Sequence, residues 1–247
     1  MRKIVLFIGV VFIALETTAQ EYLYIIEKDS YYLQEKVAVA VSDVDSITFV
    51  APNECMENGY EWVDLGLSVK WATCNVGATK PEEYGNYYAW GETTPKSIYN
   101  WSTYKWCNGS YDTMTKYCTD SDYGTVDNKT TLDPEDDAAA VNMGGSWRMP
   151  TYDELEELKT KCTWTWTTLN GVNGYNVEGP NGNSIFLPAA GWLDLHSLIS
   201  VGSYARYWSS SGPGSNGAYN LLFNSDYVDW GNYYRYYGRS VRPVLGE

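Results

Sequence analysis

From Gly59 onward the sequence is a succession of short β-prone runs separated by Gly, Asn, Asp and Ser. The runs are Ser68–Thr73, Tyr87–Trp90, Gly174–Val177, Ser184–Pro188, Tyr204–Ser209, Ala218–Phe223 and Ser240–Val244. Short runs bounded by turn-forming residues predict a domain made mainly of short strands.

Two stretches depart from this pattern and predict helices. Asp133–Met143 starts with an N-cap residue, places Pro134 at the first helical position and is followed by Gly144. Tyr152–Lys161 is preceded by Thr151, which with Glu154 forms a capping-box pattern. Strands with two mid-chain helices predict an α+β architecture, β-rich.

The N-terminus has the features of a cleavable secretory signal. Arg2 and Lys3 precede the unbroken apolar run Ile4–Leu15, and small residues at 17–19 predict cleavage before Gln20. A membrane-spanning helix needs about 20 apolar residues, so this run is too short for a permanent anchor. The first cysteine is Cys55, which does not suit lipid attachment at the cleavage site. We therefore expect a secreted, cell-surface or periplasmic protein with no membrane insertion after cleavage of residues 1–19.

Residues 20–50 predict a β-hairpin-like arm, with β-prone runs at Tyr22–Ile26, Lys36–Val41 and Ser46–Val50. An isolated hairpin is marginal in water, so the arm is expected to pack on the main domain or on an envelope or pilus partner. Residues 51–58 predict a linker, and residues 59–247 the main domain.

The formal net charge of −14 at pH 7 argues against nucleic acid and anionic lipid as partners. Export permits disulfides, and Cys107 and Cys118, on either side of a short polar loop, are the predicted pair. The remaining cysteines are expected to be small buried thiols.

Several sequence motifs occur in an order that resembles that of a known protein family. They are Trp62–Ala72, Asn75–Ala78, Gly85–Glu92, Gly145–Thr151, Tyr207–Ser211 and Arg239–Val244. The series resembles the Fibrobacter succinogenes major paralogous domain family over Gly59 to Leu245. The resemblance implies a C-type-lectin-like fold, akin to the core of formylglycine-generating enzymes, in exported proteins of Bacteroidetes and Fibrobacteres. It implies no activity.

Structural roles are expected for the tryptophans and arginines of these strings. The tryptophans should fill the core and find one partner for each indole N–H. The arginines should hold loop carbonyls or a carboxylate. The residues are Trp62, Trp71, Trp90, Trp147, Trp208, Arg148 and Arg242.

Enzymatic chemistry has little support. His196 is the only histidine, no nucleophile elbow accompanies it, and no cysteine follows Cys162 as the formylglycine-generating enzymes would require. Gly212–Gly217 matches G-x-G-x-x-G by letter but leads into a strand-like run, so it predicts a turn. Calcium in the acidic stretch Asp120–Asp137 is a hypothesis without a ligand set, and no other cofactor is predicted. A glycan-active hydrolase is the weakest alternative.

One C-terminal stretch, 224–237, is composed almost entirely of Tyr, Asn, Asp, Ser, Gly, Trp and Arg. These residue types predominate in antibody paratopes, and adjacent tyrosines on a strand cannot all face inward. The predicted binding residues are Asn224, Asp226, Tyr227, Asp229, Asn232, Tyr233, Tyr234, Arg235, Tyr236 and Tyr237. The alternative is a hairpin whose tyrosines cover the edge of the core.

The sequence thus predicts an exported, non-catalytic binding module, such as an adhesin or pilus-associated protein, that recognises glycan or protein. A structural or assembly protein of the cell envelope is the alternative, in which the 20–50 arm adds a strand to a partner's sheet.

Overall fold

The computed structural model describes residues 2–7, 22–25, 37–40, 44–50 and 55–246. The chain divides into two units, Met1–Met56 and Glu57–Glu247. Residues 51–54 of the predicted linker lie outside the described residues. Met56–Glu57, also predicted as linker, forms the short strand β5 instead.

The described residues of the first unit form four strands, besides Met56 of β5. As expected for a hairpin, β2 (Tyr22–Ile25) pairs antiparallel with β3 (Val37–Ala40). The next strand, β4 (Val44–Val50), pairs in parallel with β1 (Arg2–Phe7). Strand β1 belongs to the predicted signal peptide, whose residues 1 and 8–19 lie outside the described residues, and cleavage stays a prediction.

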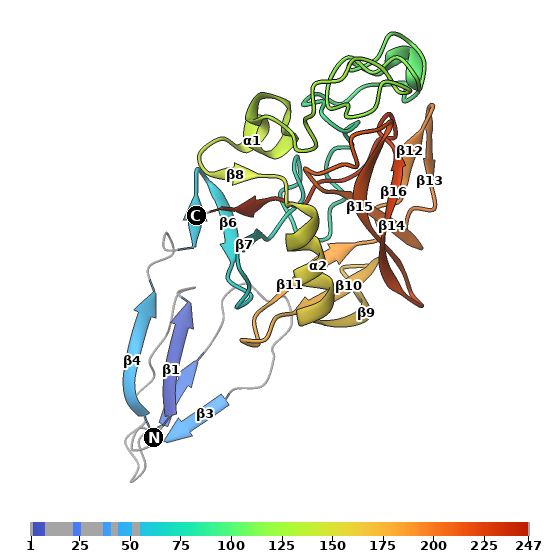
Figure 1. The fold of residues 1–247 in the computed structure, drawn as a ribbon. Helices are drawn as coiled ribbons and strands as arrows, with labels where there is room; N and C mark the ends of the chain where they lie inside the picture. Colours follow the sequence, from blue (N-terminus) through green and yellow to red (C-terminus); the bar gives the residue numbers. More distant parts are fainter. Residues whose placement is uncertain (1, 8–21, 26–36, 41–43, 51–54, 247) are drawn as a thin grey trace. The chain divides into compact units, whose positions relative to one another are not determined.

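The second unit is assembled from several small sheets (Figure 1). Their strand orders are β5-β6-β7-β17-β8, β11-β10-β9, β14-β15-β16 and β12-β13. The strands are β6 (Tyr60–Val63), β7 (Lys70–Ala72), β8 (Trp147–Arg148), β9 (Thr163–Leu169), β10 (Val172–Glu178), β11 (Ser184–Pro188), β12 (Trp192–Asp194), β13 (Ser197–Ile199), β14 (Tyr204–Trp208), β15 (Gly217–Asn224), β16 (Val228–Tyr234) and β17 (Val244–Leu245). The helices are α1 (Ala138–Met143) and α2 (Tyr152–Lys161), with 3-10 turns at Trp101–Thr103 and Pro134–Asp136. The β-rich α+β prediction is confirmed. Among the described residues, no helix has the length and apolar character needed to cross a membrane.

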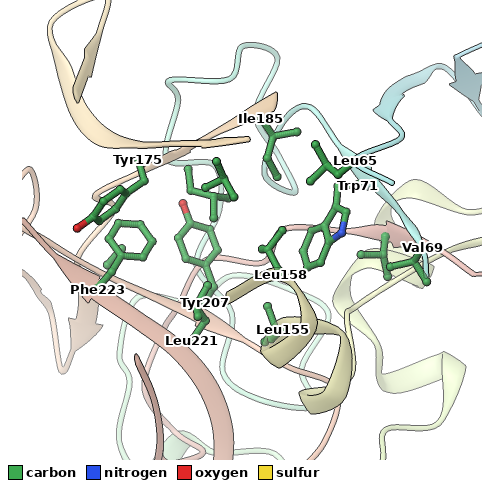
Figure 2. Close-up of a cluster of buried hydrophobic side chains, with 14 of the residues drawn as sticks. Leu65, Val69, Trp71, Leu155, Leu158, Tyr175, Ile185, Tyr207, Leu221 and Phe223 are labelled. Carbon is green, nitrogen blue, oxygen red and sulfur yellow. The ribbon is translucent and has the colours of Figure 1, made fainter. Parts of the chain in front are cut away.

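The main core forms where α2 packs against two of the sheets (Figure 2). Leu155 and Leu158 of α2 face Tyr207 and Phe223 of the β14-β15-β16 sheet and Ile185 of β11, and all five side chains are buried. Burial of large apolar side chains contributes about 1.5 to 3 kcal/mol each relative to exposure, so this cluster fixes the β14-β15-β16 sheet against the helix.

Helix α2 begins where the sequence predicts. The Thr151 side chain accepts a hydrogen bond from the Glu154 amide, and Glu154 accepts one from the Thr151 amide, which forms the capping box. The Glu154 carboxylate also binds both terminal nitrogens of Arg148, at 2.8 and 2.6 Å. Arg148 therefore holds a carboxylate, as expected, and ties β8 to the start of the helix.

The predicted helix over 133–143 is wrong in its first turns. Residues Pro134–Asp136 form a 3-10 turn, and α1 begins only after Asp137, whose side chain accepts hydrogen bonds from the amides of Ala139 and Ala140. The side chain of Asp133 caps nothing and instead accepts from Lys129 at 2.6 Å. Asp133 and Asp137 were both candidates for the N-cap. Asp133 forms an ion pair with Lys129 instead, and Asp137 caps α1.

Most predicted strands are present, with β11 matching Ser184–Pro188. Two are not. Tyr88 makes only a single bridge, to Arg239, and β17 starts at Val244 rather than Ser240. Pro243 has no amide hydrogen to donate to a ladder, which limits pairing in that segment.

Four of the five predicted core tryptophans are at most 1 % exposed, and Trp62 is half-buried. The indole N–H groups of Trp90, Trp147 and Trp208 donate to backbone carbonyls at 2.8 to 2.9 Å. The N–H of Trp71 is buried without a partner, so the expectation of one partner for every ring is wrong there.

The predicted Cys107–Cys118 disulfide is also wrong. Both are thiols: Cys107 Sγ donates to the Trp101 carbonyl at 3.2 Å, and the buried Cys118 Sγ donates to the Asp120 carbonyl at 3.0 Å.

Candidate functional site

The predicted binding stretch forms the outer strand of a three-stranded antiparallel sheet. Strand β16 pairs with β15, which pairs with β14 (Figure 1). The turn between β15 and β16 is set by Asn224, whose side chain accepts from the amides of Asp226 at 2.8 Å and Tyr227 at 3.1 Å. These side-chain bonds add to the backbone bond from the Asn224 amide to the Tyr227 carbonyl at 3.1 Å, and together they reverse the chain.

The structure divides the predicted residues into three groups. Asp226, Tyr227, Asp229, Asn232, Tyr233 and Tyr234 are exposed; Asn224, Tyr236 and Tyr237 are half-buried; Arg235 is buried. Trp230, which the sequence prediction left out of the site, is also exposed, at 39 %. Trp230 lies between the predicted residues Asp229 and Asn232, and this position could have indicated that it belongs to the site.

Arg235 does not belong to this surface. Its guanidinium donates to the carbonyls of Gly217, Lys116 and Tyr117 at 3.0, 3.1 and 2.6 Å. It also lies over the Trp90 ring, 4.7 Å from the centroid. Burial lowers its pKa from the ordinary arginine value. Arg235 comes directly after β16, where the chain turns inward, so the prediction that it binds ligand is wrong.

The exposed rings are braced by neighbouring aromatic residues. Trp230 meets Tyr152 of α2 edge-on at 4.8 Å, and Tyr234 meets Trp101 edge-on at 5.4 Å. The hydroxyls of Tyr227 and Tyr204 are hydrogen-bonded, and burial followed by this bond raises the pKa of Tyr204 to about 12. Edge-to-face pairs of this kind hold a ring in one orientation.

Tyr236 and Tyr237 form the inner part of this aromatic group. Their centroids are 4.4 Å apart, and Tyr236 also lies 4.9 Å from Trp101. Burial, and then the hydrogen bond to Tyr237, raises the pKa of Tyr236. These two half-buried rings stack against the exposed ring of Tyr234 and are themselves less accessible to a ligand.

The polar residues of the stretch differ in their availability. Asp229 is paired with Lys159 of α2 at 3.0 Å, and that bond lowers its pKa. Asp226 lies in the turn, where Ser225 donates to its carboxylate at 3.1 Å. The surface therefore carries the exposed Asp226 carboxylate, which has no ion pair among the described residues, beside the large side chains of Tyr227, Trp230, Tyr233 and Tyr234.

The acidic stretch forms an ion-pair network. Carboxylates of Asp133, Glu135 and Asp136 lie close enough together to hold a metal ion. The ammonium of Lys116 occupies the position between them, 2.7 Å from Asp133, 3.9 Å from Glu135 and 2.6 Å from Asp136. Lys105 also pairs with Asp136 at 3.1 Å and Lys129 with Asp133 at 2.6 Å, so the chain supplies its own cations to this cluster and the calcium hypothesis gains no ligand set from it.

The histidine considered as a catalytic base is exposed. His196 Nδ1 lies 3.1 Å from the Ser97 carbonyl oxygen. Gly212–Gly217 leads into β15, as expected for a turn rather than a phosphate loop.

Comparison with protein-family models, with curated proteins and with solved structures gave no match to this chain. The candidate site is therefore identified from its geometry: an exposed aromatic surface on β16 and the turn before it, with the Asp226 carboxylate in that turn.

Proposed function

We propose that this chain is an exported, non-catalytic binding module that recognises a glycan or protein ligand through β16 and the turn before it. The observation that carries the proposal is the exposure of four large aromatic side chains on one short segment. Tyr227, Trp230, Tyr233 and Tyr234 are 44, 39, 38 and 46 % exposed. Clustered exposed aromatics of this kind are typical of interaction surfaces.

The properties of the surface favour recognition over catalysis. Rings with few rotors lose little conformational entropy on binding, and Asn and Ser side chains beside them adapt to different hydrogen-bonding partners. We further propose that the second unit has the C-type-lectin-like fold that the family resemblance implies. The motif order along the chain and the β-rich architecture with two helices support it.

Alanine substitution tests the proposal. A triple variant, Tyr227→Ala, Trp230→Ala and Tyr234→Ala, should lose binding on glycan and host-protein arrays while keeping the far-ultraviolet circular dichroism of the native chain. Tyr111→Ala is the matched control, because Tyr111 is 53 % exposed and lies outside the surface. Binding that survives the triple variant would remove β16 as the site.

An assembly role is the second candidate, and one pairing favours it. Strand β4 is paired with β1, and β1 lies in the predicted signal peptide. If cleavage removes β1, that edge of β4 becomes available to a strand from a partner. Deleting residues 21–50 should abolish assembly into envelope structures but leave ligand binding intact; loss of neither property would exclude this role.

A further inference from the structure

Three arginines near the C-terminus, Arg235, Arg239 and Arg242, are buried to the same degree, at most 1 % exposed. Two of them have full sets of acceptors. Arg235 donates to three carbonyls, and Arg242 donates to the Asn75 side chain and to the carbonyls of Ala72, Thr73 and Phe186. These two guanidiniums are structural.

Arg239 differs from its two neighbours. Its Nε and Nη1 atoms are buried without a hydrogen-bond partner, and so are Nε and Nη1 of Arg206. Within the part of the chain that the structure describes, no carboxylate forms an ion pair with either residue. Burial, and then the charge of Arg206, lowers the pKa of Arg239. Buried charged donors without acceptors are costly, so the pair is incomplete as it stands.

Aromatic rings enclose the two guanidiniums. The Arg206 guanidinium carbon lies 3.9 Å from the Tyr233 centroid and 4.8 Å from that of Trp192. That of Arg239 lies 4.0 Å from Trp208 and 4.9 Å from the same Tyr233. Stacking of this kind engages the flat face of a guanidinium. The N–H donors, which lie in the guanidinium plane, are left for an acceptor such as a carboxylate.

An unpartnered acceptor lies on the same face of the sheet. By the strand register, Asn220 of β15 is directly beside Trp208, and residues two apart on a strand share a face, which includes Arg206. The Asn220 amide nitrogen donates to the Gly231 carbonyl at 2.7 Å, whereas its Oδ1 is buried without a donor. Arg206 and Arg239 thus offer free donors for an anion, and Asn220 offers a free acceptor for a hydroxyl.

Tyr233 covers this cluster from the solvent side. It is 38 % exposed and belongs to the outer strand β16. Its ring folds back over Gly231, where an added Cβ would lie 2.7 Å from it. Because both guanidiniums stack on this one ring, its rotation would uncover a face of each of them.

We propose that Arg206 and Arg239 bind the carboxylate of an acidic saccharide, with Asn220 accepting one of its hydroxyls and Tyr233 turning to stack on the sugar. This inference rests on the proposed binding function and names its ligand class. An acidic peptide side chain carries no hydroxyl for Asn220, and the net charge of −14 disfavours a polyanion.

Calorimetric titration of the full chain with galacturonic acid tests the inference, with galactose, acetate, N-acetylglutamate and inorganic sulfate as comparison probes. Galacturonic acid should bind at least about tenfold more tightly than each comparison probe, because only it supplies both a carboxylate and hydroxyls. Arg239→Met and Arg206→Gln should each weaken it by about tenfold or more. Lys70→Met is the matched control, because it removes another cation stacked on a ring, 4.1 Å from Trp62.

Equal affinity for galactose, or unchanged affinity in both arginine variants, would overturn the inference. Equal or tighter binding of N-acetylglutamate or sulfate would overturn the saccharide class. If Arg239→Met does not fold, Arg206→Gln decides. The proposed function fails separately: it falls when Tyr227, Trp230 and Tyr234 prove dispensable for array binding, whatever the arginine variants show.

Discussion

Replacing Arg235 by methionine should destabilise the protein strongly, although the sequence alone placed this residue in a binding surface. Methionine keeps much of the side-chain length but donates no hydrogen bond. The bonds to the Gly217 and Tyr117 carbonyls are buried, at 3.0 and 2.6 Å, whereas the bond to Lys116 is partly accessible to water. The substitution therefore leaves two buried acceptors without a donor.

The magnitude follows from those two acceptors. An unsatisfied buried carbonyl costs about 1 to 3 kcal/mol, so the free energy of unfolding should fall by about 2 to 6 kcal/mol. For a unit of this size, a loss near the middle, about 4 kcal/mol, lowers Tm by roughly 8 to 16 °C.

Arg239→Met is the matched comparison for this measurement. Arg239 is buried as completely, yet its Nε and Nη1 have no acceptors to leave behind. Removing an uncompensated buried charge should leave Tm unchanged or raise it. Differential scanning calorimetry of the two variants measures the contrast. Equal Tm changes, or a fall of less than about 3 °C for Arg235→Met, would refute the reasoning that acceptor satisfaction separates the two arginines.

Two further predictions concern stability. Burial acts to raise the pKa of Asp136, but hydrogen bonds from Lys116, Tyr117 and Lys105 outweigh it and hold the pKa below its ordinary value. The carboxylate therefore stabilises the fold above its unfolded pKa of about 3.9, and this stabilisation is lost as pH falls through the lower, folded pKa. In urea unfolding, Asp136→Asn should be less stable than the native chain at about pH 6, with the difference shrinking toward about pH 2; a difference independent of pH would contradict this. Thr151→Ala should cost about 1 kcal/mol through loss of the α2 cap, measured by urea unfolding, whereas Thr151→Ser should retain most of it.

The sequence by itself determined the features that depend on neighbouring residues. The capping box at Thr151 and Glu154, the turn at Gly212–Gly217 and the strand over Ser184–Pro188 all follow from local patterns. Local chemistry fixes such features because their hydrogen-bonding partners lie within a few residues. Alternation along a strand predicted that some of the adjacent tyrosines face solvent, whereas the exposure of both Tyr233 and Tyr234 was decided by the tertiary structure.

Only the tertiary structure decided which arginines are satisfied. Arg235, Arg239 and Arg242 look alike in the sequence, but their acceptors come from segments far away in the chain, such as Lys116 for Arg235 and Phe186 for Arg242. Likewise, Asp137 rather than Asp133 caps α1 because Lys116 and Lys129 reach Asp133. Long-range hydrogen bonds and ion pairs depend on how the sheets pack, and that information is not present in any single stretch of sequence.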